Sequence, residues 1–146
     1  MKTSTLLKLL KIEVDSFSYG IKKRRGLKKN TIFDAEWVNF DFHPLTNKKD
    51  PNKKKIIFQI FSNEESKNLD FNLSVSIEYK VVDKNEPKEE HNKRIATVLL
   101  PQAISFSRGY LYAATQNLAS IITLPFIDVL KSLEEKFGDQ SKTGDN

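Results

Sequence analysis

The residues of this chain that could do chemistry are few and widely separated. The two histidines are His43, which precedes a proline, and His91, which lies in a charged stretch, and neither has a second ligand at metal-binding spacing. The chain has no cysteine, only five glycines, no phosphate-binding loop and no nucleophile elbow. The pairs Glu64-Glu65 and Glu89-Glu90 lie in polar segments that would not desolvate them, so raised catalytic pKa values are not expected. We therefore expect no enzyme activity, no metal site and no cofactor.

Length and composition fit one domain. The chain has 146 residues, of which 38% are hydrophobic, and it contains ten phenylalanines against one methionine. The absence of cysteine is compatible with a reducing compartment. The first residues lack the apolar core of a signal peptide, and no stretch approaches the roughly 20 apolar residues of a membrane span. We expect a soluble, cytoplasmic protein without membrane insertion.

The positive charges are clustered. The net charge is +5, and the excess gathers in Lys22–Arg25 with Lys28 and Lys29, and in Lys48-Lys49 with Lys53–Lys55. Both clusters fall where strands are expected to turn, so we interpret them as solvated loop tips that discourage aggregation. The alternative is an anionic partner such as nucleic acid, although neither cluster carries a base-reading motif.

The first two thirds of the chain predict an antiparallel sheet. The clearest strand is Leu69–Val81, in which every odd position is apolar and every even position polar, as in a sheet with one wet face. Ile56–Phe61 is apolar on both faces. In two earlier runs the apolar residues switch between even and odd positions, between Val14 and Phe17 and between Trp37 and Val38. Such a switch predicts a bulge or a strong twist in the strand. Four such strands joined by polar loops predict a meander.

The last third predicts helices. Gln102–Leu118 has the composition of a helix, and its apolar residues cover most of the circumference, so one side would pack on the sheet and the other on a second subunit. We interpret Gly109 as a point of close helix packing, and the alternative is a contact between subunits around Arg108 and Gly109. An extended run, Ile121–Ile127, precedes a short amphipathic helix that begins near Asp128 and ends at Gly138. We expect a domain over residues 1–138 and a disordered polar tail over 139–146.

This order of elements resembles the SecB family of export chaperones. The resemblance is carried by Leu99–Gly109, which looks like the start of the family's first helix, and by Ile122–Val129, which looks like its link to the second helix. It covers about residues 8–137 in element order, and only the last third at the level of motifs. It implies an α+β fold, with a four-stranded antiparallel sheet followed by a long helix and a short C-terminal helix.

The resemblance also implies a function and a set of site residues. Family members hold unfolded or partly folded polypeptides, either preproteins for export or a dedicated antitoxin, in aromatic-lined grooves between the sheet and the second helix. The matching groove positions in this chain are Trp37, Phe40, Phe42, Phe126, Ile127, Val129 and Leu133. The alternative is that these side chains belong to the ordinary core, an interpretation that is favoured for Val129 and Leu133. The family forms homotetramers, as dimers of dimers, through the first helices, and the matching positions are Ile104, Ser107, Arg108, Leu111 and Thr115.

One departure from the family pattern concerns the partner. Export chaperones of this family are acidic and dock the translocase motor through acidic residues on the sheet. This chain is basic, and its expected wet face from Asp70 to Lys80 is of mixed charge. Docking to a translocase motor is therefore in question, whereas the role of dedicated antitoxin chaperone stays open.

Overall fold

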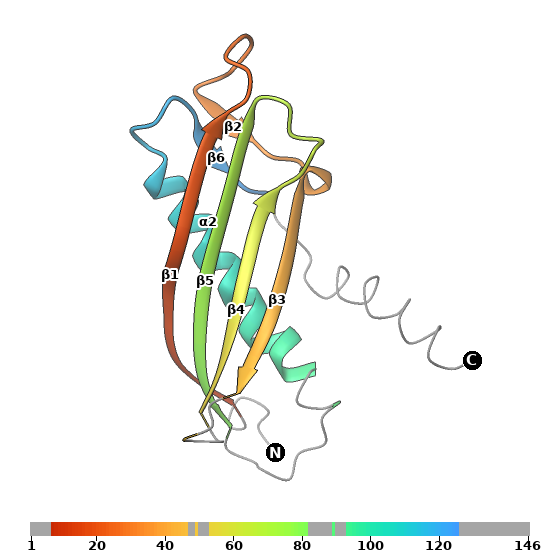
Figure 1. Ribbon diagram of the computed structural model, residues 1–146, viewed down its shortest axis with the longest axis vertical. Helices are drawn as coiled ribbons and strands as arrows, with labels where there is room; N and C mark the ends of the chain where they lie inside the picture. The colour runs from red at the N-terminus through yellow and green to blue at the C-terminus, as the bar shows by residue number, and fades with distance from the viewer. Residues whose placement is uncertain (1–6, 47–48, 50–52, 82–88, 90–92, 126–146) are drawn as a thin grey trace, which may run out of the picture.

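The protein is a four-stranded antiparallel sheet with one long helix packed across one face (Figure 1). The computed structural model describes residues 7–46, 49, 53–81, 89 and 93–125. The strands of the sheet are β1 (Leu7–Ile21), β3 (Val38–Thr46), β4 (Lys53–Ser62) and β5 (Leu69–Val81), and the helix is α2 (Leu100–Ala114). The predicted α+β class, sheet and long helix are confirmed. The predicted C-terminal helix and polar tail, and the domain boundary between them, lie outside the described residues.

The order of strands differs from the predicted meander. β3, β4 and β5 follow one another as neighbours, but β1 pairs with β5, so the order across the sheet is β1-β5-β4-β3. The expectation that β1 would lie next to β3 is wrong. The physical reason is the long connection between them, residues 22–37, which reaches the far edge of the sheet. It includes β2 (Asn30–Ile32), which pairs in parallel with β6 (Ile121–Thr123).

β1 contains the irregularity that its sequence predicts. Its pairing with β5 shifts register between Leu9 and Lys11 and again between Val14 and Ser16. The second shift restores the inward direction for the apolar residues after Val14, so the predicted bulge is confirmed. The first shift was not predicted. Because of this shift Leu10 is 41% exposed. Its two-residue spacing from Ile12 had suggested that both side chains would lie on the inward face.

The second predicted strand is two elements. A 3₁₀ turn, η2 (Ala35–Trp37), separates the short strand β2 from β3. The phase change between Trp37 and Val38 is therefore the end of this turn, and not a bulge within one strand. Phe33, which precedes the turn, is 1% exposed and makes edge-to-face contacts with Trp37 and Phe71, at centroid distances of 6.1 and 5.1 Å.

β5 follows its predicted alternation, and it lies at the centre of the core. All of its odd-numbered residues are buried against the helix side of the sheet. From β4 the residues Ile56, Phe58 and Ile60 add to this layer, each with no exposed surface. The even-numbered residues of β5 form the other face, where Gln59 donates a hydrogen bond to Asn72 across the strands at 3.0 Å. The sheet therefore has one apolar and one polar face.

The long helix begins and ends earlier than predicted. Within the described residues, helical backbone runs from Lys93 through one wider, π-type turn, η3 (Ile95–Leu99), into α2. The N–H of Leu100 bonds to the carbonyl of Ile95, five residues back, and Pro101, which has no N–H to donate, follows directly. The helix ends at Ala114, with Thr115 as its C-cap, so the predicted end at Leu118 is wrong. Among the described helices, none is long and apolar enough to cross a membrane.

Candidate functional site

The aromatic residues predicted to bind polypeptide lie at the β3 edge of the sheet. Phe40 and Phe42 pair with Ile60 and Phe58 of β4, and therefore share the apolar, helix-facing side. Trp37 stands at the start of the strand. All three side chains are half-buried and pack against the core without being enclosed by it. Three large apolar side chains thus remain partly accessible on one subunit, as the groove hypothesis requires.

β3 is an edge strand in the described part of the chain, where it pairs only with β4. Pro44 lies within it, which is typical of edge strands because proline cannot donate to a ladder on both sides. α2 runs obliquely behind the sheet, from the lower end of β3 to the upper end of β1, and packs on β5 and β6 (Figure 1). The start of β3, near Trp37, therefore lies at the margin of the helical layer.

The remaining predicted groove residues cannot be placed. Phe126, Ile127, Val129 and Leu133 all lie outside the described residues, which end at Pro125. The structure therefore describes only the sheet side of the predicted groove, which carries Trp37, Phe40 and Phe42.

The predicted oligomer-interface residues lie mostly inside the subunit. Ile104, Ser107, Leu111 and Thr115 face the sheet, with 4% exposure for Ile104 and none for the other three. Arg108 is half-buried. In this conformation the four enclosed side chains offer no surface to a second copy, so contact through the helix would use its outer side, where Tyr112 is 47% exposed.

Gly109 also lies on the outer side of the helix. A Cβ atom built on Gly109 would meet no atom within 4 Å. The interpretation that the helix packs closely over this glycine within the subunit is therefore wrong. A glycine in the middle of a helix costs roughly 1 kcal/mol relative to alanine, and the fold of one subunit does not explain that cost.

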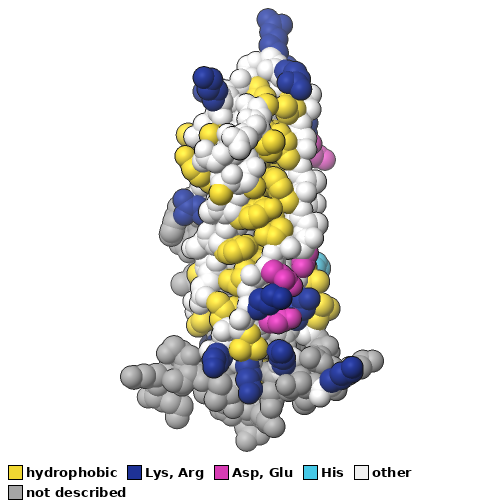
Figure 2. Space-filling view, turned by 90° about the vertical axis from the view of Figure 1, so that its left-hand side faces the viewer, with side chains coloured by type: hydrophobic (Ala, Val, Ile, Leu, Met, Phe, Trp, Pro, Cys, Tyr) yellow, Lys and Arg dark blue, Asp and Glu magenta, His cyan; other side chains and the backbone are white. Residues whose placement is uncertain are grey.

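A second apolar surface follows the β1 edge. It consists of half-buried side chains from β1 and α2, which we call the β1–α2 stripe, and Figure 2 shows hydrophobic side chains along this side of the molecule. Its members are Ile12, Val14, Phe17, Tyr19, Phe106 and Tyr110. Phe17 meets Tyr110 edge to face at 5.7 Å. Sequence reasoning missed this surface, although the i, i+4 spacing of the two helix aromatics was its signal.

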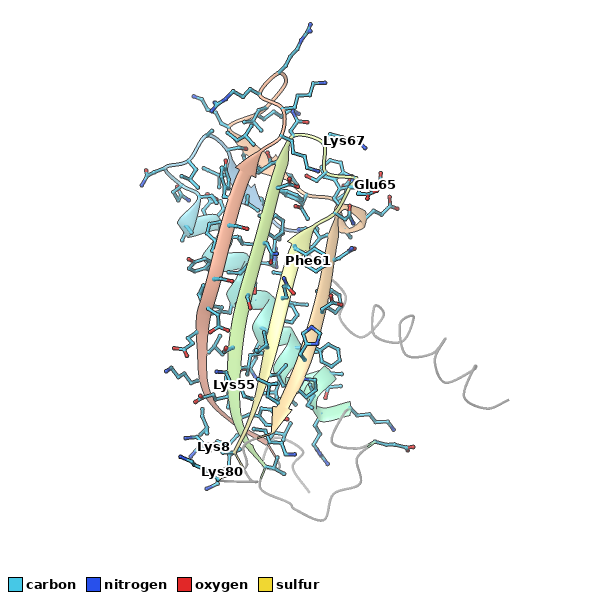
Figure 3. All side chains as sticks on the ribbon, viewed as in Figure 1. Lys8, Lys55, Phe61, Glu65, Lys67 and Lys80 are labelled. Carbon is cyan, nitrogen blue, oxygen red and sulfur yellow. The ribbon has the colours of Figure 1, made fainter. Side chains whose placement is uncertain are left out.

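The basic clusters lie at opposite ends of the sheet. Residues 22–29 form the loop after β1, as predicted. Lys53–Lys55, however, are the first residues of β4 and not a loop tip. Lys53 and Lys8 both pair with Lys80, which places three lysines side by side across β4, β5 and β1. Figure 3 shows Lys8, Lys55 and Lys80 together at this end of the molecule.

Groups able to do chemistry are sparse in the described residues. No three His, Asp or Glu side chains among them gather as a metal site. His43 is exposed, and His91 lies outside the described residues. Among the described residues, the large pKa change is that of Tyr79, where burial raises the pKa to about 12. A buried tyrosine that holds its proton more tightly is a core residue and not a general base.

Comparisons with known proteins bear on the fold. No protein-family model matches the sequence, and no curated protein matches it. Among solved structures, the chain is similar to the SecB-like chaperone Rv1957 of Mycobacterium tuberculosis, in complex with a ChAD peptide from the Rv1956 HigA1 antitoxin. The TM-score is 0.61 and the identity 13%, over 86% of this chain and 90% of that chain.

A second similar structure is a protein of unknown function from Streptococcus agalactiae. The TM-score is 0.50 and the identity 14%, over 82% of this chain and 97% of that chain. Both likenesses cover most of both chains, so they concern the whole arrangement of sheet and helix. With the four-stranded sheet and the oblique helix described above, they show that this chain has a SecB-like fold.

Proposed function

We propose that this protein is a chaperone that holds unfolded or partly folded polypeptides and catalyses no reaction. The observation that carries the proposal is the set of half-buried aromatics at an edge strand: Trp37, Phe40 and Phe42. An unfolded segment offers apolar side chains and unpaired backbone groups. Flat aromatic side chains accept many apolar partners at low entropic cost.

Two classes of client polypeptide fit this proposal. The SecB-like chaperone Rv1957 is in complex with a peptide of an antitoxin, which supports a polypeptide client, and a dedicated antitoxin is one candidate. A preprotein for export is the other. The polar face of β5 carries Asp70 and Glu78 together with Lys80, so it offers no uniformly acidic surface to a translocase motor. This composition favours the antitoxin class, and both would be met in the cytoplasm.

We also propose that the chaperone works as a homo-oligomer, a tetramer built as a dimer of dimers. The β1–α2 stripe supports this, because it places several half-buried aromatics beside the long edge strand β1. Light scattering at micromolar concentration tests the proposal. A tetrameric mass is expected, and a stable monomer would remove it.

The function is tested by aggregation and binding assays together. The protein is expected to suppress the aggregation of a chemically denatured test protein and to bind client peptides. The double variant F40S/F42S, which removes two accessible rings, should lose most of this activity. The matched control is I57S/F61S, which removes two half-buried apolar side chains from the polar face of the sheet. Equal losses in both variants, or no holdase activity in the parent protein, would contradict the proposal.

A nucleic-acid-binding role is the second candidate, because the loop of residues 22–29 concentrates six cations. Such binding would weaken steeply with salt, because each phosphate contact releases counterions. Labelled RNA and DNA that show no binding at low ionic strength would dismiss this candidate.

A further inference from the structure

A hollow lies at the end of the molecule where β1 ends and β3 begins. Its volume is about 290 Å³, and it is formed by the loop after β1, by β2 and by the turn between β4 and β5. Leu27, Ile32 and Trp37 give it an apolar lining. Ile32 is 66% exposed, the largest exposed fraction among the large hydrophobic residues that the structure describes. A hollow of this size could take one or two apolar side chains, and the exposure of Ile32 would be reduced if they bound there.

The loop that borders the hollow is held in place by Asn68. The side-chain amide of Asn68 donates to the backbone carbonyls of Lys23 and Arg25, each at 3.2 Å. The backbone carbonyl of Asn68 accepts the N–H groups of Lys22 and Lys23 at 2.9 and 3.3 Å. Gly26 turns the chain with a φ of +82°, a conformation that other residues rarely adopt. The side chains of this loop are therefore presented from a fixed backbone.

Among the described residues, most cations of this loop have no ion-pair partner. Lys22 binds Asp70 at 3.2 Å and the carbonyl of Ser66 at 2.8 Å. In contrast, no ion pair within the described part of the chain involves the other five, which are Lys23, Arg24, Arg25, Lys28 and Lys29. Lys28 and Lys67 line the hollow with a single carboxylate, Glu65, and Figure 3 shows Glu65 and Lys67 on the β4–β5 turn. Figure 2 shows Lys and Arg side chains at this end of the molecule, which is uppermost in the view.

We infer that this hollow is an anchor site for the client, and that it selects a polypeptide segment in which an apolar side chain is flanked by acidic residues. The inference rests on the proposed function and adds a preference to it. Charge complementarity identifies the occupant, because Lys28 and Lys67 line the hollow, and the loop that borders it carries four further cations with no ion pair among the described residues. Trp37 belongs both to the hollow and to the aromatic set of the β3 edge, so a segment anchored here would continue along β3.

Trp37 also supplies the measurement, because it is the only tryptophan in the chain. Three peptides with the same Leu-Phe-Leu centre are compared, flanked by glutamates, by lysines or by serines. The acidic peptide is expected to change the Trp37 emission and to bind about tenfold more tightly than the lysine-flanked peptide at low salt, as a few exposed ion pairs would allow. Molar salt, which shortens the screening length to about 3 Å, should remove most of this difference.

Charge-reversal variants test whether the loop cations cause the preference for the acidic peptide. The variant K23E/R25E/K28E should bind the acidic peptide about tenfold more weakly than the parent protein and the lysine-flanked peptide more tightly. The matched control K53E/K55E/K80E makes the same change in net charge at the other end of the sheet and should preserve the order of the three peptides. Circular dichroism and urea unfolding verify that both variants are folded.

The outcomes separate this inference from the proposed function. Suppression of aggregation without any difference between the acidic and basic peptides would overturn the anchor site alone. The same holds if both triple variants respond alike, because the effect would then be one of net charge. Failure to bind any peptide would overturn the holdase as well. An RNA or DNA oligonucleotide that binds at this loop and displaces the acidic peptide would reassign the cations to nucleic acid.

Discussion

Replacing Tyr19 with phenylalanine removes one oxygen atom that joins two distant parts of the fold. The Tyr19 hydroxyl donates to the carbonyl of Ser120 at 3.0 Å and accepts the N–H of the same residue at 2.9 Å. Tyr19 lies on β1, and Ser120 stands directly before β6, at the point where the chain returns from α2 towards the sheet. The hydroxyl therefore satisfies both backbone groups of a residue with no exposed surface.

The expected loss follows from what the phenylalanine leaves behind. A buried donor or acceptor without a partner costs about 1–3 kcal/mol, whereas the ring itself and its packing are retained. Two backbone groups lose one partner each, and some rearrangement towards water is available because Tyr19 is only half-buried. We therefore expect Y19F to lower the free energy of unfolding by about 2 kcal/mol.

Tyr110 provides the matched control. It is also half-buried, its ring stacks on Phe106 at 6.4 Å and meets Phe17, and its hydroxyl makes no hydrogen bond in the part of the chain described. Removing that hydroxyl should therefore change the stability by less than about 0.5 kcal/mol. The two variants delete the same atom from the same type of residue, so their difference isolates the two hydrogen bonds.

Urea unfolding, followed by the fluorescence of Trp37, measures both variants. Y19F should lower the urea midpoint with an unchanged slope, and Y110F should leave both near the parent values. Hydrogen exchange at the Ser120 amide gives an independent measurement, because in Y19F this amide should lose protection while those of β5 keep theirs. Equal midpoints for Y19F and Y110F would refute the assignment of stability to this contact.

Three further predictions follow from burial and backbone geometry. F58A should lower the free energy of unfolding by about 3–5 kcal/mol because Phe58 has no exposed surface. F42A, at a half-buried position, should lower it by less but weaken client binding more. Urea unfolding and peptide titrations measure the two effects. Burial raises the pKa of Tyr79 from 10.0 to about 12, so the stabilisation contributed by its neutral hydroxyl is complete below pH 10 and is lost as the pH rises towards 12. This loss amounts to roughly 3 kcal/mol and should be absent in Y79F, as unfolding measured across that range would show. G26A should cost about 1–2 kcal/mol in urea unfolding because of the positive φ at Gly26, and a G20A control, at an exposed strand position with open space around it, should cost less.

Sequence reasoning succeeded where one local pattern determined the outcome. The alternation from Leu69 to Val81 fixed the central strand and both of its faces, because side chains alternate along any strand. The phase change after Val14 predicted a bulge, because only an extra residue keeps both apolar runs on one face. These features depend on neighbouring residues alone.

The failures concern interactions between distant segments. Nothing local in β1 shows that it pairs with β5 and not with β3, since both would offer a suitable apolar face. Thr115 ends α2 because its hydroxyl donates to Leu111 at 2.6 Å and accepts the N–H of Ile122 at 2.9 Å, a contact that requires β6 to be in place. Likewise, the periodicity of α2 identified Ile104 and Leu111 as apolar, but it could not decide between the sheet and a second subunit as their partner.

The two edges of the sheet are protected in different ways, and the difference agrees with different uses. Edge strands invite unwanted pairing, which natural proteins limit with bulges, prolines and charges. β1 is long, with two register shifts, and the β1–α2 stripe runs beside it, as a surface for a second copy would require. β3 is shorter, contains Pro44 and presents its aromatics beside a fixed basic loop. If the proposed function is correct, a client at β3 would be held mainly by its side chains, which suits a chaperone that must also release what it binds.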